Sequence, residues 1–314
     1  MVDVKSNGML SQAKCVACGH LGAQQFLVAP DRYHGRTVKY CLARCPQCTF
    51  VWLHDPPNPE EMYEHYTADY DAAIAKAGET SPSRWEARRE VLAQYKKSGA
   101  LLDLGCSSGS FLETLKGTEW QLLGIEMSKE SAERAKQRSG AHVFVGDILD
   151  APFPGKSFDA ITCFHVFEHL YNPTEILAKV AYWLKPGGIF YVLVPNIDSA
   201  AVHVFGTYWY GLELPRHLFH YSPASLAYLA KSAGLEVAHL ETQREVFFEK
   251  SSKYILDDVF RKFGVQNVPL SKAKDASLPF KVVRKAFRLT VLPLIDGMIG
   301  LAGDKESIHA VLHK

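Results

Sequence analysis

Residues 101–111 combine a short apolar strand with a glycine-rich turn, and they constrain the fold more than any other segment. The run reads Leu-Leu-Asp-Leu-Gly-Cys-Ser-Ser-Gly-Ser-Phe, and the amphipathic start of a helix follows at 111–115. A strand, a glycine turn and a helix in this order form the nucleotide-binding corner of a doubly wound sheet. Gly105 permits a sharp turn, and Gly109 permits close approach of the backbone to a ligand.

The same alternation of strand and helix continues along the chain. Strands are predicted at 122–126, 142–147, 158–164 and 188–194, and helices are predicted between them at 128–138 and 173–184. Such alternation implies a mostly parallel sheet, whose ligands bind at the carboxyl ends of the strands. We expect Glu126, Asp147 and His165 to meet the glycine turn at that edge. Glu126 follows Asp103 by 23 residues, close to the spacing of an acid that binds ribose hydroxyls.

The order and spacing of these motifs resemble class I S-adenosylmethionine-dependent methyltransferases. The resemblance covers roughly 98–240 and rests on Leu-Asp-Leu-Gly-Cys-Ser-Ser-Gly, Gly-Ile-Glu126, Gly-Asp147-Ile, Phe-Glu168-His169-Leu and Leu-Lys-Pro-Gly-Gly. Ser107 stands where the family usually has its middle glycine, so it must adopt the turn conformation. A nicotinamide-dependent dehydrogenase is the structural alternative, and the Leu-Lys-Pro-Gly-Gly turn argues against it.

The resemblance implies a Rossmann-like, seven-stranded α/β sheet that binds S-adenosylmethionine. Asp103 and the two glycines of the turn would line its methionine end, Glu126 its ribose and Asp147 its adenine amine. The expected cofactor contacts are Asp103, Gly105, Cys106, Gly109, Phe111, Glu126, Met127, Asp147, Ile148 and Phe164.

Five of the seven cysteines precede residue 49. Cys15-Val-Ala-Cys18 and Cys45-Pro-Gln-Cys48 are two knuckles separated by 26 residues, slightly more than the ~15–20 typical of such zinc sites. Each knuckle presents two thiolates to one tetrahedral Zn²⁺, and the alternating residues between them predict a hairpin. We therefore expect a zinc ribbon with a structural Zn²⁺. The alternative, a reduced redox pair, does not explain two pairs, and Cys41 is expected to pack within a strand.

The predicted organisation places small modules around the methyltransferase core. These are a zinc ribbon at 1–54, a linker with cofactor-covering helices at 55–97, the core at 98–242, a helical insertion at 243–303 and the closing strand of the core at 304–314. Within the insertion, 281–288 is basic and amphipathic and 289–303 is nearly all apolar. An interfacial helix on an anionic membrane, a homodimer contact and a lid are the alternatives for this segment.

Composition limits the classes of partner and the compartment. The net charge is +1, so no global field draws the chain to nucleic acid. The first residues lack the apolar core of a signal peptide, and no apolar run reaches the ~18 residues of a membrane span. We expect a cytoplasmic protein, with peripheral membrane contact through 243–303 as an alternative.

Two histidine clusters are candidates for the acceptor side. In the first, His165-Val-Phe-Glu168-His169, a helix start would place the three polar side chains on one face. The cluster resembles the metal-binding Glu-x-x-Glu-His of quinone-ring O-methyltransferases and small-RNA 2′-O-methyltransferases. His165 replaces the first acid, which disfavours Mg²⁺ because imidazole suits softer metals. A metal site, a base that faces the substrate and a purely structural role remain open.

The second cluster lies at 214–223, in the connection that usually builds the acceptor pocket. His217 is a candidate base, while Tyr208, Arg216 and His220 are candidate substrate contacts. The alternative is a loop held by its own hydrogen bonds. Ser222 and Pro223 are expected to cap and begin the next helix.

The best-supported function is O-methylation of a sugar or small-molecule hydroxyl in glycan or secondary-metabolite biosynthesis. We expect His169 or His217 to act as base, with Glu168 orienting an imidazole and His165 beside them. C-methylation of a deoxysugar, RNA methylation and a non-catalytic cofactor-binding scaffold are the alternatives. RNA is disfavoured because the ribbon lacks a basic patch interleaved with aromatic residues.

Overall fold

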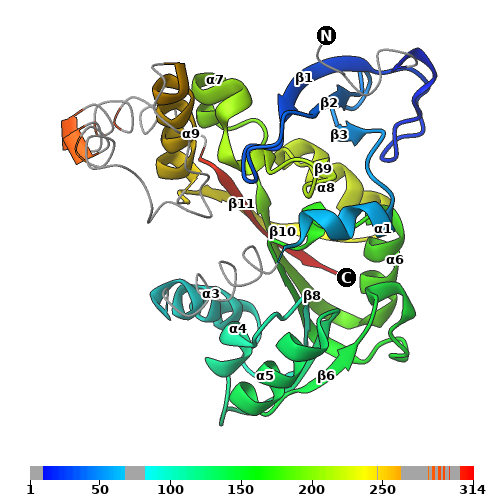
Figure 1. Cartoon of the computed structure of the whole chain (residues 1–314). Helices are drawn as coiled ribbons and strands as arrows, with labels where there is room; N and C mark the ends of the chain where they lie inside the picture. Colours follow the sequence, from blue (N-terminus) through cyan, green and yellow to red (C-terminus); the bar gives the residue numbers. More distant parts are fainter. Residues whose placement is uncertain are drawn as a thin grey trace. The chain divides into compact units, whose positions relative to one another are not determined.

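The computed structural model describes residues 10–67, 82–245, 247–262 and 305–314, with seven single positions between 282 and 297. Its contacts divide the chain into two compact units, drawn in Figure 1. Unit one comprises the described residues of Met1–Thr67, Pro195–Ser225 and Thr242–Ile308. Unit two comprises those of Ala68–Val194, Leu226–Glu241 and His309–Lys314.

Unit two is built on a seven-stranded sheet in the order β10-β11-β8-β7-β4-β5-β6. The strands, in this order, are Glu236–Gln243, Ser307–His313, Leu184–Pro195, Phe158–Phe164, Gly99–Leu104, Trp120–Glu126 and His142–Val145. The pairs β4–β5, β4–β7, β5–β6 and β7–β8 are all parallel. The predicted Rossmann-like seven-stranded sheet is therefore confirmed, and β4 stands near its middle.

Helices cover both faces of this sheet. In Figure 1, α3, α4 and α5 lie on one side of the strands and α6 on the other. Their bounds are Pro82–Tyr95, Ser110–Glu113, Lys129–Ser139 and Pro173–Trp183. The Ser128 hydroxyl caps α5 by accepting a hydrogen bond from the Ser131 amide, and Gly140 ends the helix with φ +75°. Single 3-10 turns lie at Ile148–Asp150 and Phe167–His169.

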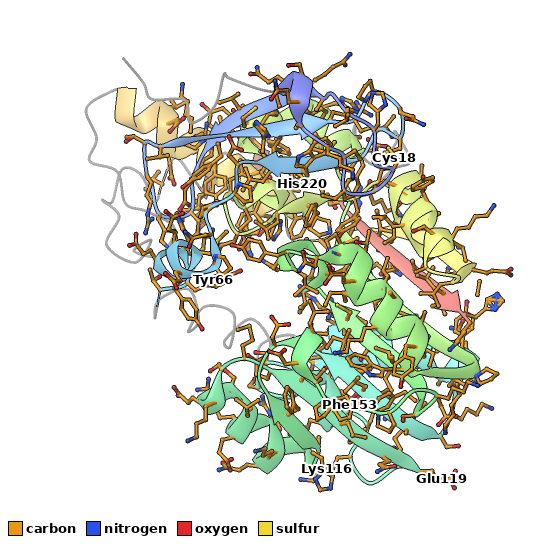
Figure 2. The ribbon with its side chains drawn as sticks, turned by 90° about the vertical axis from the view of Figure 1, so that its right-hand side faces the viewer. Cys18, Tyr66, Lys116, Glu119, Phe153 and His220 are labelled. Carbon is orange, nitrogen blue, oxygen red and sulfur yellow. The ribbon has the colours of Figure 1, made fainter. Side chains whose placement is uncertain are left out.

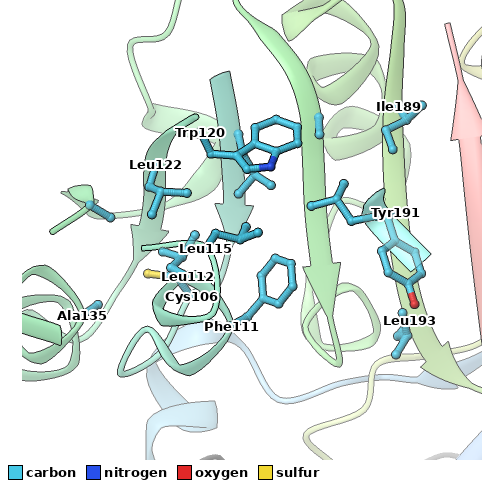
Figure 3. Packing of buried hydrophobic residues seen from close by; sticks show 14 of the residues in the cluster. Cys106, Phe111, Leu112, Leu115, Trp120, Leu122, Ala135, Ile189, Tyr191 and Leu193 are labelled. Carbon is cyan, nitrogen blue, oxygen red and sulfur yellow. The ribbon is translucent and has the colours of Figure 1, made fainter. Parts of the chain in front are cut away.

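Apolar side chains from α3, α4 and the strands fill one core (Figure 3). Phe111, Leu112 and Leu115 of the α4 segment belong to the same cluster as Leu101 of β4 and Trp120 and Leu122 of β5, while Tyr191 and Leu193 extend the cluster to β8. Close packing of this kind fixes the turn between β4 and α4, which is the part of the fold that carries the predicted cofactor residues.

Unit one contains a four-stranded sheet in the order β1-β2-β3-β9, here called the N-terminal sheet. Its strands are Gln24–Pro30, Lys39–Arg44, Val51–His54 and Phe219–His220. All three pairings are antiparallel. The last strand comes from 214–223, here called the acceptor loop after its predicted role, so that loop is part of the same sheet as the cysteine-bearing hairpin.

Further helices lie outside the core of the seven-stranded sheet. They are Leu10–Gln12, α1 at Pro59–Met62, Tyr63–His65, α7 at Ala200–Phe205, Gly206–Tyr208, Tyr210–Leu212 and α9 at Phe247–Lys262 in unit one, and α8 at Pro223–Ser232, most of which belongs to unit two. As expected, α8 begins at Pro223, and the Ser222 hydroxyl accepts a hydrogen bond from the Ser225 amide at 3.1 Å. The predicted basic and apolar segments at 281–303 lie outside the described residues, apart from single exposed positions. Where the structure is described, it has no helix that is both long and apolar enough to cross a membrane.

Candidate functional site

The turn between β4 and α4 has three residues with positive φ. They are Gly105 at +68°, Ser107 at +48° and Gly109 at +77°. Ser107 therefore adopts the left-handed conformation that the family's usual glycine would adopt without steric cost. A Cβ on Gly105 would lie 2.5 Å from Val166, and a Cβ on Gly109 would lie 2.8 Å from Ala135 of α5. Both glycines are therefore required by packing as well as by backbone conformation.

Glu126, at the end of β5, links this turn to the start of α5 through hydrogen bonds. One carboxylate oxygen accepts a hydrogen bond from the Ser107 amide at 2.9 Å, and the other accepts one from the Ser128 amide at 2.9 Å. Because a carboxylate offers about four lone-pair directions, each oxygen can still accept another bond. A half-buried acid in this position has the acceptors that a ribose diol needs.

Asp103 lies beneath the same turn, with its side chain inside the protein. Its carboxylate accepts a hydrogen bond from the Thr162 hydroxyl of β7 at 2.7 Å. Burial raises the pKa of Asp103 to about 7, although the Thr162 hydrogen bond and the Arg88 charge act in the opposite direction. The corner therefore holds a buried acid that binds a proton near neutrality.

Helix α3 adds an aromatic wall that the sequence analysis did not specify. Trp85 lies 6.4 Å from both Phe111 and Phe164, measured between ring centroids, and the last two meet edge to face at 4.9 Å. The guanidinium of buried Arg88 lies 4.5 Å from the centre of the Trp85 ring. Trp85 and Arg88 are three residues apart within 55–97, where cofactor-covering helices were predicted. This spacing indicates that the two side chains share one face of a helix.

The other predicted cofactor residues have different environments. Cys106 is buried, and its sulfur packs against Gly124, where an added Cβ would come within 2.7 Å of it. Ile148 is buried and Met127 is exposed. Asp147 is exposed, and its carboxylate accepts a hydrogen bond from the Leu149 amide at 2.7 Å.

The segment after β7 corrects one expectation. His165, Glu168 and His169 do not begin an α-helix, because Phe167–His169 is a single 3-10 turn and His165 precedes it with φ +56°. Two of the side chains nevertheless meet, with His165 Nδ1 lying 3.5 Å from a Glu168 oxygen. Glu168 is only 1% exposed. A buried carboxylate and an imidazole thus stand at the carboxyl end of the strand next to β4.

In unit one, the four predicted metal-ligating cysteines come together. Cys15 Sγ lies 3.6 Å from Cys48 Sγ, and Cys18 Sγ lies 3.6 Å from Cys45 Sγ. The four sulfurs all lie within 4.8 Å of one another. Four thiolates around a tetrahedral Zn²⁺ at 2.3 Å would be about 3.8 Å apart, so this donor set fits the ion. The fifth N-terminal cysteine, at position 41, is buried in β2 and outside the cluster, as expected.

His217 of the acceptor loop is held in one tautomer. Its Nδ1 lies 2.8 Å from the Gly211 carbonyl, and since a carbonyl can only accept, Nδ1 carries the proton. The basic nitrogen is then Nε2, which lies 3.7 Å from a Glu213 oxygen. His220 is buried in β9, and burial together with the nearby His217 holds the pKa of His220 well below its ordinary value.

Two predicted substrate contacts are engaged within unit one. The Tyr208 hydroxyl donates to Asp258 of α9 at 2.7 Å, and the Arg32 guanidinium lies 3.8 Å from the centre of the Tyr208 ring. Arg216 is fully buried. Its Nε donates to Glu213 at 3.3 Å, and its Nη1 lies 3.2 Å from His34 Nδ1. Through these contacts, Tyr208 and Arg216 stabilise the segments of unit one in which they lie.

A buried carboxylate that the sequence analysis missed lies at the centre of these contacts. Asp31 Oδ2 is 2.9 Å from His34 Nδ1, 3.3 Å from His65 Nδ1 and 3.9 Å from Arg216 Nη1. Burial alone would raise the pKa of Asp31, but the His65 hydrogen bond and the Arg216 charge hold it at about 2. A second guanidinium, from Arg36, lies 3.3 Å from the His65 ring. Because guanidinium groups already surround Asp31, this cluster disfavours an added cation.

Comparison with known proteins decides the family. The model of a methyltransferase domain matches residues 77–240. The chain belongs to this family, and it is an S-adenosylmethionine-dependent methyltransferase. A ubiquinone biosynthesis O-methyltransferase of Thiobacillus denitrificans is 33% identical over 170 aligned positions, and the match covers 50% of this chain and 71% of that protein. A ubiquinone biosynthesis O-methyltransferase of Xanthomonas axonopodis pv. citri is 33% identical over 160 aligned positions, and the match covers 47% of this chain and 67% of that protein.

A solved structure supports the fold of this methyltransferase. An S-adenosylmethionine-dependent methyltransferase from Archaeoglobus fulgidus matches with a TM-score of 0.51 at 18% identity. The match covers 78% of this chain and 100% of that one. It confirms the class I sheet, whose strand order places β4 and β5 side by side.

Replacing Glu126 tests the cofactor corner. Glu126→Ala removes both the predicted ribose contact and the tie between the turn and α5, so it should weaken binding of S-adenosylhomocysteine at least tenfold. Loss of hydrogen bonds to a charged group costs about 1.5–3 kcal/mol, which corresponds to roughly that factor. Titration calorimetry measures the change. Glu130→Ala, an exposed change on the first turn of α5, is the matched control, and unchanged affinity in Glu126→Ala would contradict the assignment.

Replacing Asp31 tests the buried charge cluster. Asp31→Asn removes one of the two carboxylates beside buried Arg216 and leaves its charge paired with Glu213 alone, which should destabilise unit one by about 3 kcal/mol. Urea unfolding at pH 7 measures this loss, with Asp198→Asn as an exposed control. The pKa of Asp31 is lower in the folded state than its ordinary 3.8, so its stabilisation is present above pH ~4 and is lost as the pH falls towards ~2. The gap between the wild type and Asp31→Asn should close over that interval, and a constant gap would count against the cluster.

Proposed function

We propose that this methyltransferase transfers the methyl group to a hydroxyl of a sugar or small-molecule acceptor. The observation that carries the proposal is the buried Glu168 beside His165 and His169 at the end of β7, because a hydroxyl acceptor must lose a proton. The similarity to proteins named ubiquinone biosynthesis O-methyltransferase supports transfer to oxygen. A role in glycan or secondary-metabolite biosynthesis, and nucleic acid as a disfavoured partner, stay predictions.

The chain's own residues would align the acceptor and accept its proton. When bound, S-adenosylmethionine supplies an electrophilic methyl group. His169 or His217 takes the proton from the acceptor oxygen as that oxygen attacks, since imidazole accepts protons near neutrality. In His217 the accepting atom is Nε2, because Nδ1 donates to the Gly211 carbonyl. Glu168 orients His165 and stabilises positive charge beside it.

The base assignment predicts a large kinetic effect. Single-turnover rates should be measured at saturating S-adenosylmethionine, with an acceptor found by screening catechols and nucleotide sugars for release of S-adenosylhomocysteine. Either His169→Ala or His217→Ala should lower the rate ~10²–10⁴-fold. His142→Ala, at the far end of β6, is the control. If His165→Ala, His169→Ala and His217→Ala all stay within about threefold of the parent, transfer needs no histidine base, and the acceptor is a nucleophilic amine or carbanion.

We further propose that Cys15, Cys18, Cys45 and Cys48 hold one structural Zn²⁺. The fit of their sulfur–sulfur distances to a tetrahedral site supports this. A hairpin of this size buries too little apolar surface to be stable without such a link. Membrane contact or a homodimer through 243–303, and a cytoplasmic location, likewise stay predictions.

Metal analysis tests the zinc site. Protein purified without chelator should contain one Zn²⁺ per chain. Cys45→Ser should lose the metal and unfold the hairpin that carries the knuckles, while S-adenosylhomocysteine binding in unit two persists. Cys41→Ser, in the same hairpin but outside the cluster, should keep its zinc. Less than half an equivalent in the parent protein would contradict the site.

A further inference from the structure

The acceptor loop and the cysteine knuckles share backbone hydrogen bonds. Strand β9 pairs with β3 so that Trp52 lies opposite Phe219 and Val51 lies opposite His220. The Leu53 amide also donates to the Leu218 carbonyl at 2.7 Å. Strand β3 begins three residues after Cys48, so the loop that carries His217 and His220 is paired directly to the end of the second knuckle.

The side chain of Phe50 makes the same connection through packing. Phe50 is fully buried and stacks on Phe219, with ring centroids 5.7 Å apart and an interplanar angle of 18°. Its ring centroid also lies 5.6 Å from that of Tyr221. The Phe50 carbonyl accepts a hydrogen bond from the Cys45 amide at 2.9 Å, and this bond closes the knuckle. The position of this ring therefore depends on the geometry of the second knuckle.

The two histidines lie on either side of this contact. His217 precedes Leu218, and His220 is itself in β9. Figure 2 labels Cys18 and His220, which both belong to unit one. His220 is therefore part of the β3–β9 pairing and His217 directly precedes it, whereas the turn at Gly105 and Glu126 belongs to unit two.

We propose that a metal ion in the four-cysteine cluster positions His217 and His220, acting through Phe50 and the β3–β9 pairing. The N-terminal sheet is then part of the acceptor-binding apparatus, and Phe50 is a positioning residue. This inference rests on the proposed zinc site and on the proposed acceptor role of the loop. It predicts that the metal controls the acceptor loop and leaves cofactor binding unchanged.

The contacts of Arg216 should limit the effect of metal loss to β9. Arg216 is tied to Glu213 and to His34 near Asp31, and these contacts do not pass through the knuckles. Without metal, the segment before His217 therefore keeps its buried ion pairs while β9 loses its support. The expected state has a displaced β9 within a folded chain.

Hydrogen exchange of the full chain measures this effect. Zinc-loaded protein should be compared with protein depleted by a chelator and with depleted protein reloaded with Zn²⁺. Amides at 217–222 should exchange about tenfold faster or more after depletion, since losing the β9 pairing lowers the opening free energy of that segment. Reloading should restore their protection, while β4 and β5 stay unchanged. The affinity for S-adenosylhomocysteine should stay within about twofold, well under the tenfold step of 1.4 kcal/mol.

A variant separates positioning from simple unfolding of the hairpin. Phe50→Ala, with its zinc content confirmed at one per chain, should show the same fast exchange at 217–222. Phe50→Leu, which keeps most of the apolar volume, should restore much of the protection. Phe26→Ala, on β1 of the same sheet, is the matched control. With an acceptor in hand, Phe50→Ala should change the acceptor KM or kcat and leave the KM for S-adenosylmethionine unchanged.

Three results would overturn the inference. The first is unchanged exchange at 217–222 after zinc is removed, and the second is unchanged exchange there in zinc-loaded Phe50→Ala. The third is absence of zinc from the purified protein. Failure to find a hydroxyl acceptor would instead overturn the proposed reaction, because the exchange measurement needs no turnover.

Discussion

The Glu126 carboxylate accepts one hydrogen bond from the Ser107 amide and one from the Ser128 amide, and so ties the turn after β4 to the start of α5. The rest of the corner depends on this tie. It supports Ser107 in a left-handed conformation, and it accompanies the close packing of Gly109 on Ala135. Because each oxygen retains an acceptor direction, the group that organises the turn can also bind a ribose diol.

Unit one is organised by a different constraint, the burial of charge. Asp31 and Arg216 are fully buried, and such groups are tolerated only when opposite charges and hydrogen bonds surround them. Their contacts join the hairpin tip to the acceptor loop, and the β3–β9 pairing joins the knuckles to the same loop. The sheet that carries the four cysteines is thus continuous with the segment that carries His217 and His220.

Local patterns predicted the alternating strands and helices, including the helices at 128–138 and 173–184, and the convergence of Cys15, Cys18, Cys45 and Cys48, while the resemblance to the family implied the seven-stranded sheet. Each of these depends on residues whose spacing carries the signal. The two-residue strand at Phe219 and the contact between Asp31 and Arg216 depend on pairing across more than 150 residues, for which the sequence has no periodicity. The turn at His165 was missed because helix propensity does not report a positive φ, which His165 adopts next to Val166, whose side chain lies against Gly105.

We propose that the turn after β4 and the Glu126 carboxylate form the cofactor site of this methyltransferase. A crystal structure of the chain with S-adenosylhomocysteine would test this proposal. We expect both ribose hydroxyls within hydrogen-bonding distance of Glu126, the amino-acid end against the backbone of 105–109, and the adenine beside Asp147 and Ile148. A nucleoside bound away from the carboxyl ends of β4 and β5, or a ribose without contact to Glu126, would contradict it.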